Sequence, residues 1–156
     1  MRMSKGVEWA IHTLLNLGAV GDRRVSVTLL ARAHDVSEPY LTKQLQQLVK
    51  HGLLTSTPGP RGGYSLGRSL DQITLLDVVE AIEGTTSTFH CAEIRCCGLI
   101  GELSPPPTGP CAVMVAMTRA EDAWREALRA ETLGDIRSAL EGKVHNAVRA
   151  ALEQSR

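Results

Sequence analysis

Apolar residues recur at intervals of three and four in three stretches of the first 52 residues. This spacing places the side chains on one face of a helix, and it predicts helices over residues 5–19, over 27–34, and from 38 to a stop at Gly52. Ser4 and Ser37 are placed to cap the first and third helices. The very short connection between the second and third helices is typical of a helix-turn-helix.

A β-hairpin follows the third helix in the predicted order. Residues 53–57 and 64–66 have the composition of strands, and the glycine- and proline-rich run 58–63 predicts the turn between them. Thr74 and Asp77 resemble a capping box that opens a fourth helix, which Gly84 closes. Three helices followed by a hairpin are the elements of a winged helix-turn-helix.

The second half of the chain alternates between a long loop and helical patterns. Residues 85–110 show no periodicity, and their glycines and three consecutive prolines predict a functional loop. From 112 to about 130, apolar residues repeat at helical spacing and predict an amphipathic helix that needs a partner. We therefore expect a mainly α fold with a small β-hairpin wing. Its parts are a winged helix-turn-helix domain (1–84), a cysteine-containing loop (85–111), and a dimerisation helix with C-terminal helices (112–156).

The net charge of zero conceals an asymmetry between the two halves. Residues 1–70 carry nine Lys or Arg against four Asp or Glu, whereas residues 71–156 carry eight against thirteen. A basic N-terminal half suits a polyanion such as DNA. No stretch has the length of a membrane span or the pattern of a secretion signal, so we expect a cytoplasmic protein without a membrane partner. Four cysteines in a reducing compartment favour metal binding, redox sensing or burial over disulfides.

The polar face of the third predicted helix carries side chains suited to reading DNA. Glutamines can hydrogen-bond to base edges, and lysines can contact phosphates. In the hairpin, an arginine beside a glycine is placed to approach a groove closely. Each residue alone would be an ordinary solvated side chain, but their joint placement favours DNA. The predicted DNA-binding residues are Ser37, Tyr40, Lys43, Gln44, Gln47, Lys50, Arg61 and Gly62.

Candidate metal ligands occur on the first helix and at the two ends of the loop. Glu8 and His12 are four residues apart and share a helix face, which lets both side chains approach one metal. Cys91 begins the loop and Cys111 ends it, whereas the adjacent Cys96–Cys97 pair is a poor match to one small cluster. The spacing alone leaves open a surface Glu–His pair and buried, inert cysteines.

The first 84 residues resemble the winged-helix iron-sulfur regulators of the IscR and NsrR family. The resemblance rests on matches at fixed spacing: Ser37, Tyr40-Leu41, Lys43, Leu45, Leu48, Gly52-Leu53, Gly62-Gly63-Tyr64, Ile73-Thr74-Leu75 and Glu83-Gly84. Within this family the chain is most similar to the RsrR type of redox sensor. Those matches are Gly6 to Ala10, His12, Cys91, Glu93 to Arg95, Cys111 and Ala116-Met117.

The resemblance implies that Glu8, His12, Cys91 and Cys111 bind a 2Fe-2S cluster at a homodimer interface. Glu8 and His12 would come from one subunit and the cysteines from the other, so residues 85–111 would be a cluster-binding loop. We expect a redox-responsive regulator, of repressor type, that binds a near-palindromic operator in double-stranded DNA when the cluster is oxidised. Trp9, beside Glu8, is expected to transmit the redox change to the DNA-reading helix or the wing.

Two other interpretations remain open at the level of sequence. The same fold can be regulated by thiol oxidation or by zinc, with Cys96 and Cys97 taking part. A cysteine-nucleophile enzyme is a third class, because Cys111 stands at a predicted helix N-terminus, where a thiol pKa falls. We expect a non-enzyme, since the sequence shows no second catalytic base and no nucleotide-binding fingerprint.

Overall fold

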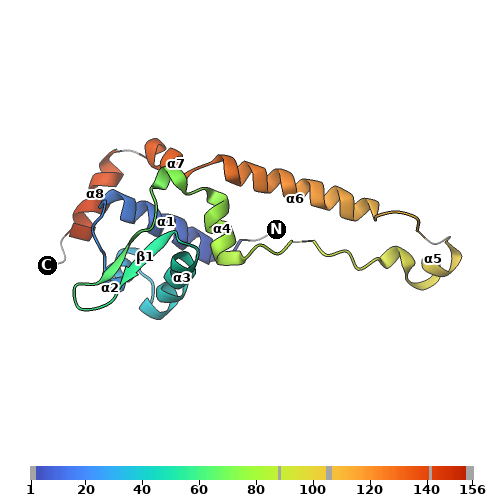
Figure 1. The fold of residues 1–156 in the computed structure, drawn as a ribbon, viewed down its shortest axis with the longest axis horizontal. Helices are drawn as coiled ribbons and strands as arrows, with labels where there is room; N and C mark the ends of the chain where they lie inside the picture. The colour runs from blue at the N-terminus through green and yellow to red at the C-terminus, as the bar shows by residue number, and fades with distance from the viewer. Residues whose placement is uncertain (1–2, 88, 105–106, 141, 154–156) are drawn as a thin grey trace. The chain divides into compact units, whose positions relative to one another are not determined.

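The computed structural model describes residues 3–87, 89–104, 107–140 and 142–153, and it is mainly helical with one β-hairpin (Figure 1). The fold class predicted from the sequence is confirmed. The chain divides into two compact units. The first unit contains residues 2–84 and 128–156, and the second contains residues 85–127.

Three helices form the centre of the first unit: α1 (Lys5–Ala19), α2 (Val27–His34) and α3 (Glu38–Lys50). Their bounds match the sequence prediction, because the apolar stripes are buried together. Leucines dominate this core, and the fully buried ones include Leu14, Leu17, Leu30, Leu41, Leu45 and Leu48.

The helix caps differ in part from the prediction. Ser4 and Ser37 occupy the N-cap positions of α1 and α3, but neither hydroxyl makes a capping hydrogen bond among the described residues. The backbone amide of Ser4 instead donates to the Glu83 carboxylate at 2.9 Å. Ser26 is the serine that caps, accepting from the Leu29 amide at the start of α2. Capping needs a suitable side-chain rotamer as well as the right residue type.

The wing consists of β1 (Leu54–Thr57) and β2 (Gly63–Leu66), paired antiparallel from Leu54 opposite Leu66 to Thr57 opposite Gly63. The sequence placed Gly63 in the turn, whereas the structure places it in the strand, with φ 142°. A Cβ at Gly63 would lie 2.5 Å from the Val25 carbonyl oxygen, so glycine permits this approach. The neighbouring Tyr64 exchanges two backbone hydrogen bonds with Val25, which fixes the wing beside the start of α2.

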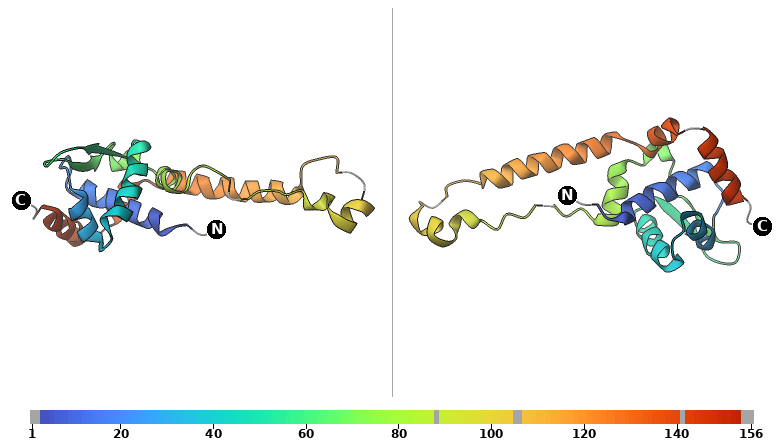
Figure 2. Two further views of the ribbon diagram at one scale, coloured as in Figure 1. Left: turned by 90° about the horizontal axis from the view of Figure 1, so that it is seen from below. Right: turned by 180° about the vertical axis from the view of Figure 1, so that it is seen from behind.

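Helix α4 (Leu75–Glu83) begins with the predicted capping box of Thr74 and Asp77, after a short 3₁₀ turn η1 (Leu70–Gln72). A second capping box, formed by Thr132 and Asp135, opens α7 (Leu133–Ala139). Helix α8 (Gly142–Glu153) packs against α1 and α2, and the views in Figure 2 agree on its place beside α1. Helices α7 and α8, which the sequence analysis grouped with the dimerisation helix, therefore complete the winged-helix core.

The second unit contains a 3₁₀ turn η2 (Ile94–Cys96), the short helix α5 (Gly98–Leu103) and most of α6 (Ala112–Ala130). The bounds of α6 match the prediction. Helix α5 lies within the segment 85–110, predicted as a loop, because six residues are too few to show a helical period. No residue of α6 is buried, and the exposed apolar side chains include Val113 and Met117. None of the helices in the described residues has the length and hydropathy needed to cross a membrane.

Candidate functional site

Helix α3 presents one buried face and one polar face. Leu41, Leu45 and Leu48 are fully buried in the core. Lys43 and Lys50 are exposed on the other side, and Tyr40, near the start of the helix, is 37% exposed. This arrangement leaves cationic and aromatic side chains available to a DNA groove, as a recognition helix requires.

The two glutamines predicted to read bases are less open than the lysines. Gln44 is half-buried, and a Cβ at Gly6 would come within 2.9 Å of its side-chain oxygen, so the amide lies against the start of α1. Gln47 is also half-buried, and its backbone carbonyl accepts from the ring Nδ1 of His51 at 2.9 Å. Base reading by either glutamine stays a prediction.

The tip of the wing has the geometry of a tight, exposed turn. Arg61 is exposed, and the Gly62 amide donates to the Gly59 carbonyl at 2.9 Å. A Cβ at Gly62 would lie 2.1 Å from the Thr57 carbonyl oxygen, which excludes any larger residue. The turn therefore exposes the Arg61 guanidinium to solvent beside Gly62, which has no side chain.

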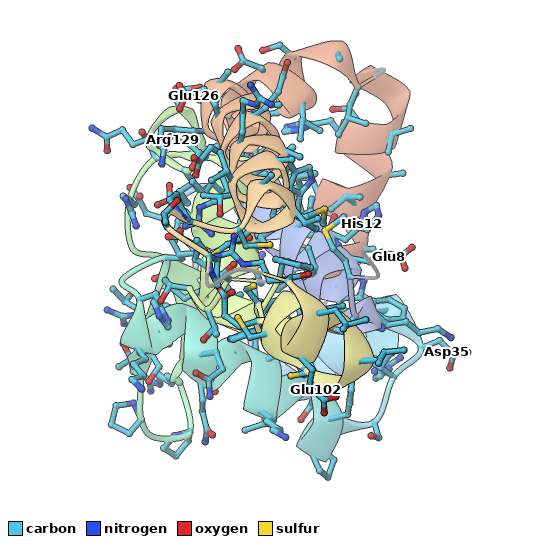
Figure 3. All side chains as sticks on the ribbon, turned by 90° about the vertical axis from the view of Figure 1, so that its right-hand side faces the viewer. Glu8, His12, Asp35, Glu102, Glu126 and Arg129 are labelled. Carbon is cyan, nitrogen blue, oxygen red and sulfur yellow. The ribbon has the colours of Figure 1, made fainter. Side chains whose placement is uncertain are left out.

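Glu8 and His12 are both exposed on α1 and lie on the same side of the helix (Figure 3). They line a shallow hollow whose other walls include the apolar side chains of Met3, Val7 and Ile11. The spacing predicted that the pair shares a face, and the structure confirms that point. The hollow offers one carboxylate and one imidazole to a ligand that approaches α1.

Trp9 lies between these two candidate ligands in the sequence. It packs against α2, the next helix of the helix-turn-helix. Its ring centroid lies 5.5 Å from that of His34 in an edge-to-face contact. The His34 Nε2 is also within hydrogen-bond distance of Thr13 Oγ1 (3.2 Å) and Asn16 Nδ2 (3.3 Å). Burial, and then the charge of His12, lower the pKa of His34. His34, which the sequence analysis missed, thus joins the ligand-bearing helix to α2.

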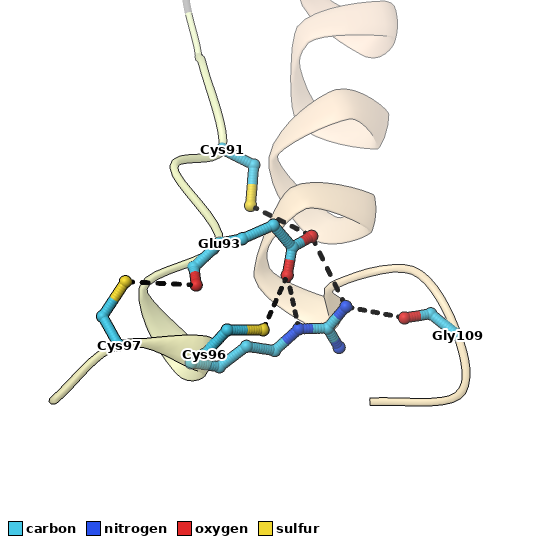
Figure 4. Close-up of polar contacts among 6 residues, drawn as sticks. Cys91, Glu93, Cys96, Cys97 and Gly109 are labelled. Atoms are coloured by element: carbon cyan, nitrogen blue, oxygen red, sulfur yellow. Dashed lines mark hydrogen bonds and ion pairs between the residues drawn. The ribbon is translucent and has the colours of Figure 1, made fainter. Parts of the chain in front are cut away.

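Three cysteines of the second unit, Cys91, Cys96 and Cys97, contact one acidic residue, Glu93 (Figure 4). The thiols of Cys91 and Cys96 donate to its carboxylate at 3.8 and 4.0 Å, and the Cys97 thiol donates to its carbonyl at 3.9 Å. Arg95 donates from Nε to the same carboxylate at 2.7 Å. The guanidinium beside Glu93 holds the pKa of its carboxyl below the usual range.

Cys91 and Cys111 are brought together although nineteen residues separate them in the sequence. Their thiols lie close enough for each to shift the pKa of the other. The backbone N–H groups of Met114 and Val113, at the start of α6, lower the pKa of the Cys111 thiol. For Cys91, a backbone hydrogen bond at Glu93 acts to lower the pKa, but desolvation and the contact with Cys111 outweigh it and raise the pKa.

The structure therefore provides two pairs of candidate ligands in two separate units. Glu8 and His12 belong to the first unit, and Cys91 and Cys111 belong to the second. Within the described residues, no group of three His, Cys, Asp or Glu side chains is arranged to hold a metal ion. Glu93 and Arg95 had no role assigned from sequence, although their position just after Cys91 was a signal.

Comparisons with known proteins, by sequence and by structure, agree with one another. Residues 3–139 match the Rrf2 family, described as iron-dependent transcriptional regulators. The chain is 33% identical over 136 residues to the protein aau3 of Rhizobium meliloti, covering 87% of this chain and 84% of that protein. It is 31% identical over 93 residues to the HTH-type transcriptional regulator IscR of Cereibacter sphaeroides, covering 58% of this chain and 60% of IscR.

Solved structures show the same architecture. CymR, the global cysteine regulator of B. subtilis, has a TM-score of 0.69 and 26% sequence identity, with 90% of this chain and 99% of CymR covered. T. potens IscR has a TM-score of 0.63 at 21% identity, covering 93% of this chain and 96% of that one, which supports the fold. The family resemblance seen in the sequence is confirmed, and the chain belongs to the Rrf2 family of helix-turn-helix transcriptional regulators rather than to an enzyme class.

Proposed function

We propose that the protein is a cytoplasmic, homodimeric repressor whose affinity for DNA follows the redox state of a 2Fe-2S cluster. Glu8 and His12 of one subunit, with Cys91 and Cys111 of the partner subunit, would hold the cluster. The observation that carries the proposal is the proximity of the Cys91 thiol to the Cys111 thiol at the start of α6, close enough for each to shift the other's pKa. Two thiols are half of a four-ligand set, so the remaining ligands have to come from elsewhere.

The residues present fit such a cluster in their chemistry. Thiolates are the usual ligands of iron-sulfur clusters, and imidazole replaces thiolate on one iron of Rieske centres. Glu8 adds a hard oxygen donor, which favours ferric over ferrous iron. Because Glu8 and His12 are exposed on α1, a second subunit can reach them without disturbing the core. The match to a family described as iron-dependent transcriptional regulators supports an iron site over an unrelated metal.

DNA recognition is assigned to the polar face of α3 and to the tip of the wing. Lys43 and Lys50 are placed to contact phosphates, and Tyr40 and Ser37 lie at the end of α3 that enters the groove. Gln44 and Gln47 would have to turn toward the groove to read base edges. Arg61 would enter a minor groove or hold the backbone. A two-fold dimer presents two such sets, which suits a near-palindromic operator.

Trp9 and His34 are proposed to couple the ligand face of α1 to DNA binding. When bound, the cluster would supply a one-electron redox centre. A change of charge at Glu8 and His12 is then felt at Trp9, which contacts His34 in α2 at 5.5 Å between ring centroids. Helix α2 packs on α3, so a shift of the Trp9–His34 contact alters how the recognition helix is presented. We propose that the oxidised state binds DNA and that reduction weakens binding.

The test is an absorption spectrum with iron and sulfide assays on anaerobically purified protein, together with DNA binding in both redox states. A two-fold dimer would form two such sites, so the parent should contain about two irons and two sulfides per subunit. Glu8→Ala and His12→Ala should change the visible spectrum and the redox dependence of DNA binding. His51→Ala, at an exposed histidine that is the C-cap residue of α3, is the control for the spectrum. Spectra of both ligand variants that match the parent would reject the assignment.

Regulation by thiol oxidation is the second candidate, favoured by the contact between Cys91 and Cys111. CymR, the global cysteine regulator of B. subtilis, shares the fold at 26% identity. This alternative predicts colourless protein without iron, and DNA binding that responds to a thiol oxidant. The same purification therefore separates the two candidates.

A further inference from the structure

We propose that Glu93 and Arg95 form a brace that positions Cys91 and Cys111 as a ligand pair, and that Arg95 supplies the positive charge that this pair needs. The inference deepens the proposed function, on which its metal-bound part rests. The word brace refers here to Glu93, Arg95 and the carbonyl of Gly109. All three lie in the second unit.

One guanidinium joins the two segments of chain that carry the thiols. Arg95 donates from Nε to Glu93 Oε2 at 2.7 Å and from Nη2 to Glu93 Oε1 at 3.4 Å. Its Nη2 also donates to the Gly109 carbonyl at 2.6 Å (Figure 4). Glu93 is two residues after Cys91, and Gly109 is two residues before Cys111. The guanidinium therefore fixes the distance between the two backbone segments that carry Cys91 and Cys111.

The backbone at Glu93 indicates that the arrangement is specific. Glu93 has φ 50° and ψ 38°, a left-handed conformation that residues other than glycine adopt rarely. Its carbonyl accepts from the Cys96 amide at 2.8 Å, which begins the η2 turn. In this conformation the Glu93 side chain faces Arg95, Cys91 and Cys96 together. An ordinary surface ion pair does not require a left-handed backbone conformation.

The brace also balances charge around the sulfur atoms. The Glu93 carboxylate accepts hydrogen bonds from the thiols of Cys91 and Cys96. A metal-bound sulfur has no proton to donate, so the carboxylate would repel it. The Arg95 guanidinium, in contact with the carboxylate, offsets that repulsion. Charges and hydrogen bonds that act on the ligands from just outside them tune both metal retention and reduction potential.

The first experiment needs no iron. In full-length protein with Cys96→Ser and Cys97→Ser, freed of metal by a chelator, Cys91 and Cys111 are equilibrated with reduced and oxidised glutathione. Each oxidised glutathione takes two electrons from the two thiols and yields two reduced glutathiones, while one intrachain disulfide forms. Mass spectrometry of alkylated protein gives the equilibrium constant, which measures how closely the thiols are held. Arg95→Gln should lower this constant several-fold, whereas Arg119→Gln on exposed α6 should leave it unchanged.

The second experiment measures iron-loaded protein and uses the opposite charges of the brace. Arg95→Gln removes a positive charge and should shift the reduction potential to more negative values. Glu93→Gln removes a negative charge and should shift it to more positive values. Both variants should lose iron to a chelator about tenfold faster than the parent. A merely structural contribution would move the two potentials in the same direction or not at all.

The outcomes separate this inference from the proposed function. An iron-free parent would overturn the cluster, yet the glutathione equilibrium would still test the brace. An unchanged equilibrium constant in Arg95→Gln would overturn the brace even if the parent binds iron. If circular dichroism shows that Arg95→Gln has lost helical structure, the equilibrium constant is measured for Arg95→Lys instead. It keeps the charge but cannot reach Glu93 and Gly109 together, so an equilibrium constant equal to the parent's would refute the brace.

Discussion

The two compact units of this chain obtain their order in different ways. In the first unit, leucines from α1, α2 and α3 are fully buried against each other and against α7 and α8. In the second unit, α6 has no buried residue, and the cysteine segment is held by hydrogen bonds around Glu93 and Arg95. A unit whose apolar side chains are buried against one another is stable by itself. A unit that exposes its apolar side chains and is held by polar contacts requires a partner subunit or a ligand.

The largest expected effect is on the core of the first unit. Leu45 of α3 is fully buried, so Leu45→Ala should lower the free energy of unfolding by about 2–5 kcal/mol through lost burial and a cavity. Leu99→Ala, at a position of α5 that is 68% exposed, is the matched control and should cost less than about 1 kcal/mol. Urea unfolding measures both. Equal costs would show that the second unit is as tightly packed as the first.

The second prediction concerns the exposed apolar side chains of α6, proposed as the dimer contact. Val113→Glu combined with Met117→Glu places two carboxylates among the exposed apolar side chains of α6. The dissociation constant of the homodimer should rise about 30-fold or more, equivalent to about 2 kcal/mol. Sedimentation velocity over a range of concentrations measures this change, and Thr118→Glu on the same helix is the control. A dimer that survives the double change would assign the contact to another surface.

The smallest effect is expected at the DNA surface, where each contact is one of many. Arg61→Ala at the wing should weaken operator binding about tenfold and flatten the dependence on salt by about one unit. Arg119→Ala, in the second unit, removes the same charge and should leave DNA affinity unchanged within about twofold. Fluorescence anisotropy at several salt concentrations distinguishes the two. Equal losses would indicate that general charge, rather than the wing, governs binding.

Much of the first unit could be predicted from sequence because its helices have strong amphipathic periods. The bounds of α1 and α2 and the Thr74–Asp77 capping box are as predicted. Ser4 and Ser37 occupy the predicted N-cap positions, but among the described residues neither hydroxyl makes a capping hydrogen bond, since residue type does not fix a rotamer. Within the second unit, α5 is too short to give a period, and the contact between Cys91 and Cys111 depends on how the loop folds back.

Local periodicity and fixed spacing were sufficient to predict the order of the winged-helix elements, the shared face of Glu8 and His12, and the family. The place of α7 and α8 in the first unit's core follows instead from three-dimensional packing. The fold alone joined Trp9 to His34, and Arg95 to Glu93 and Gly109. These contacts link residues distant in sequence or in a loop without periodicity, where no local pattern specifies which side chains meet.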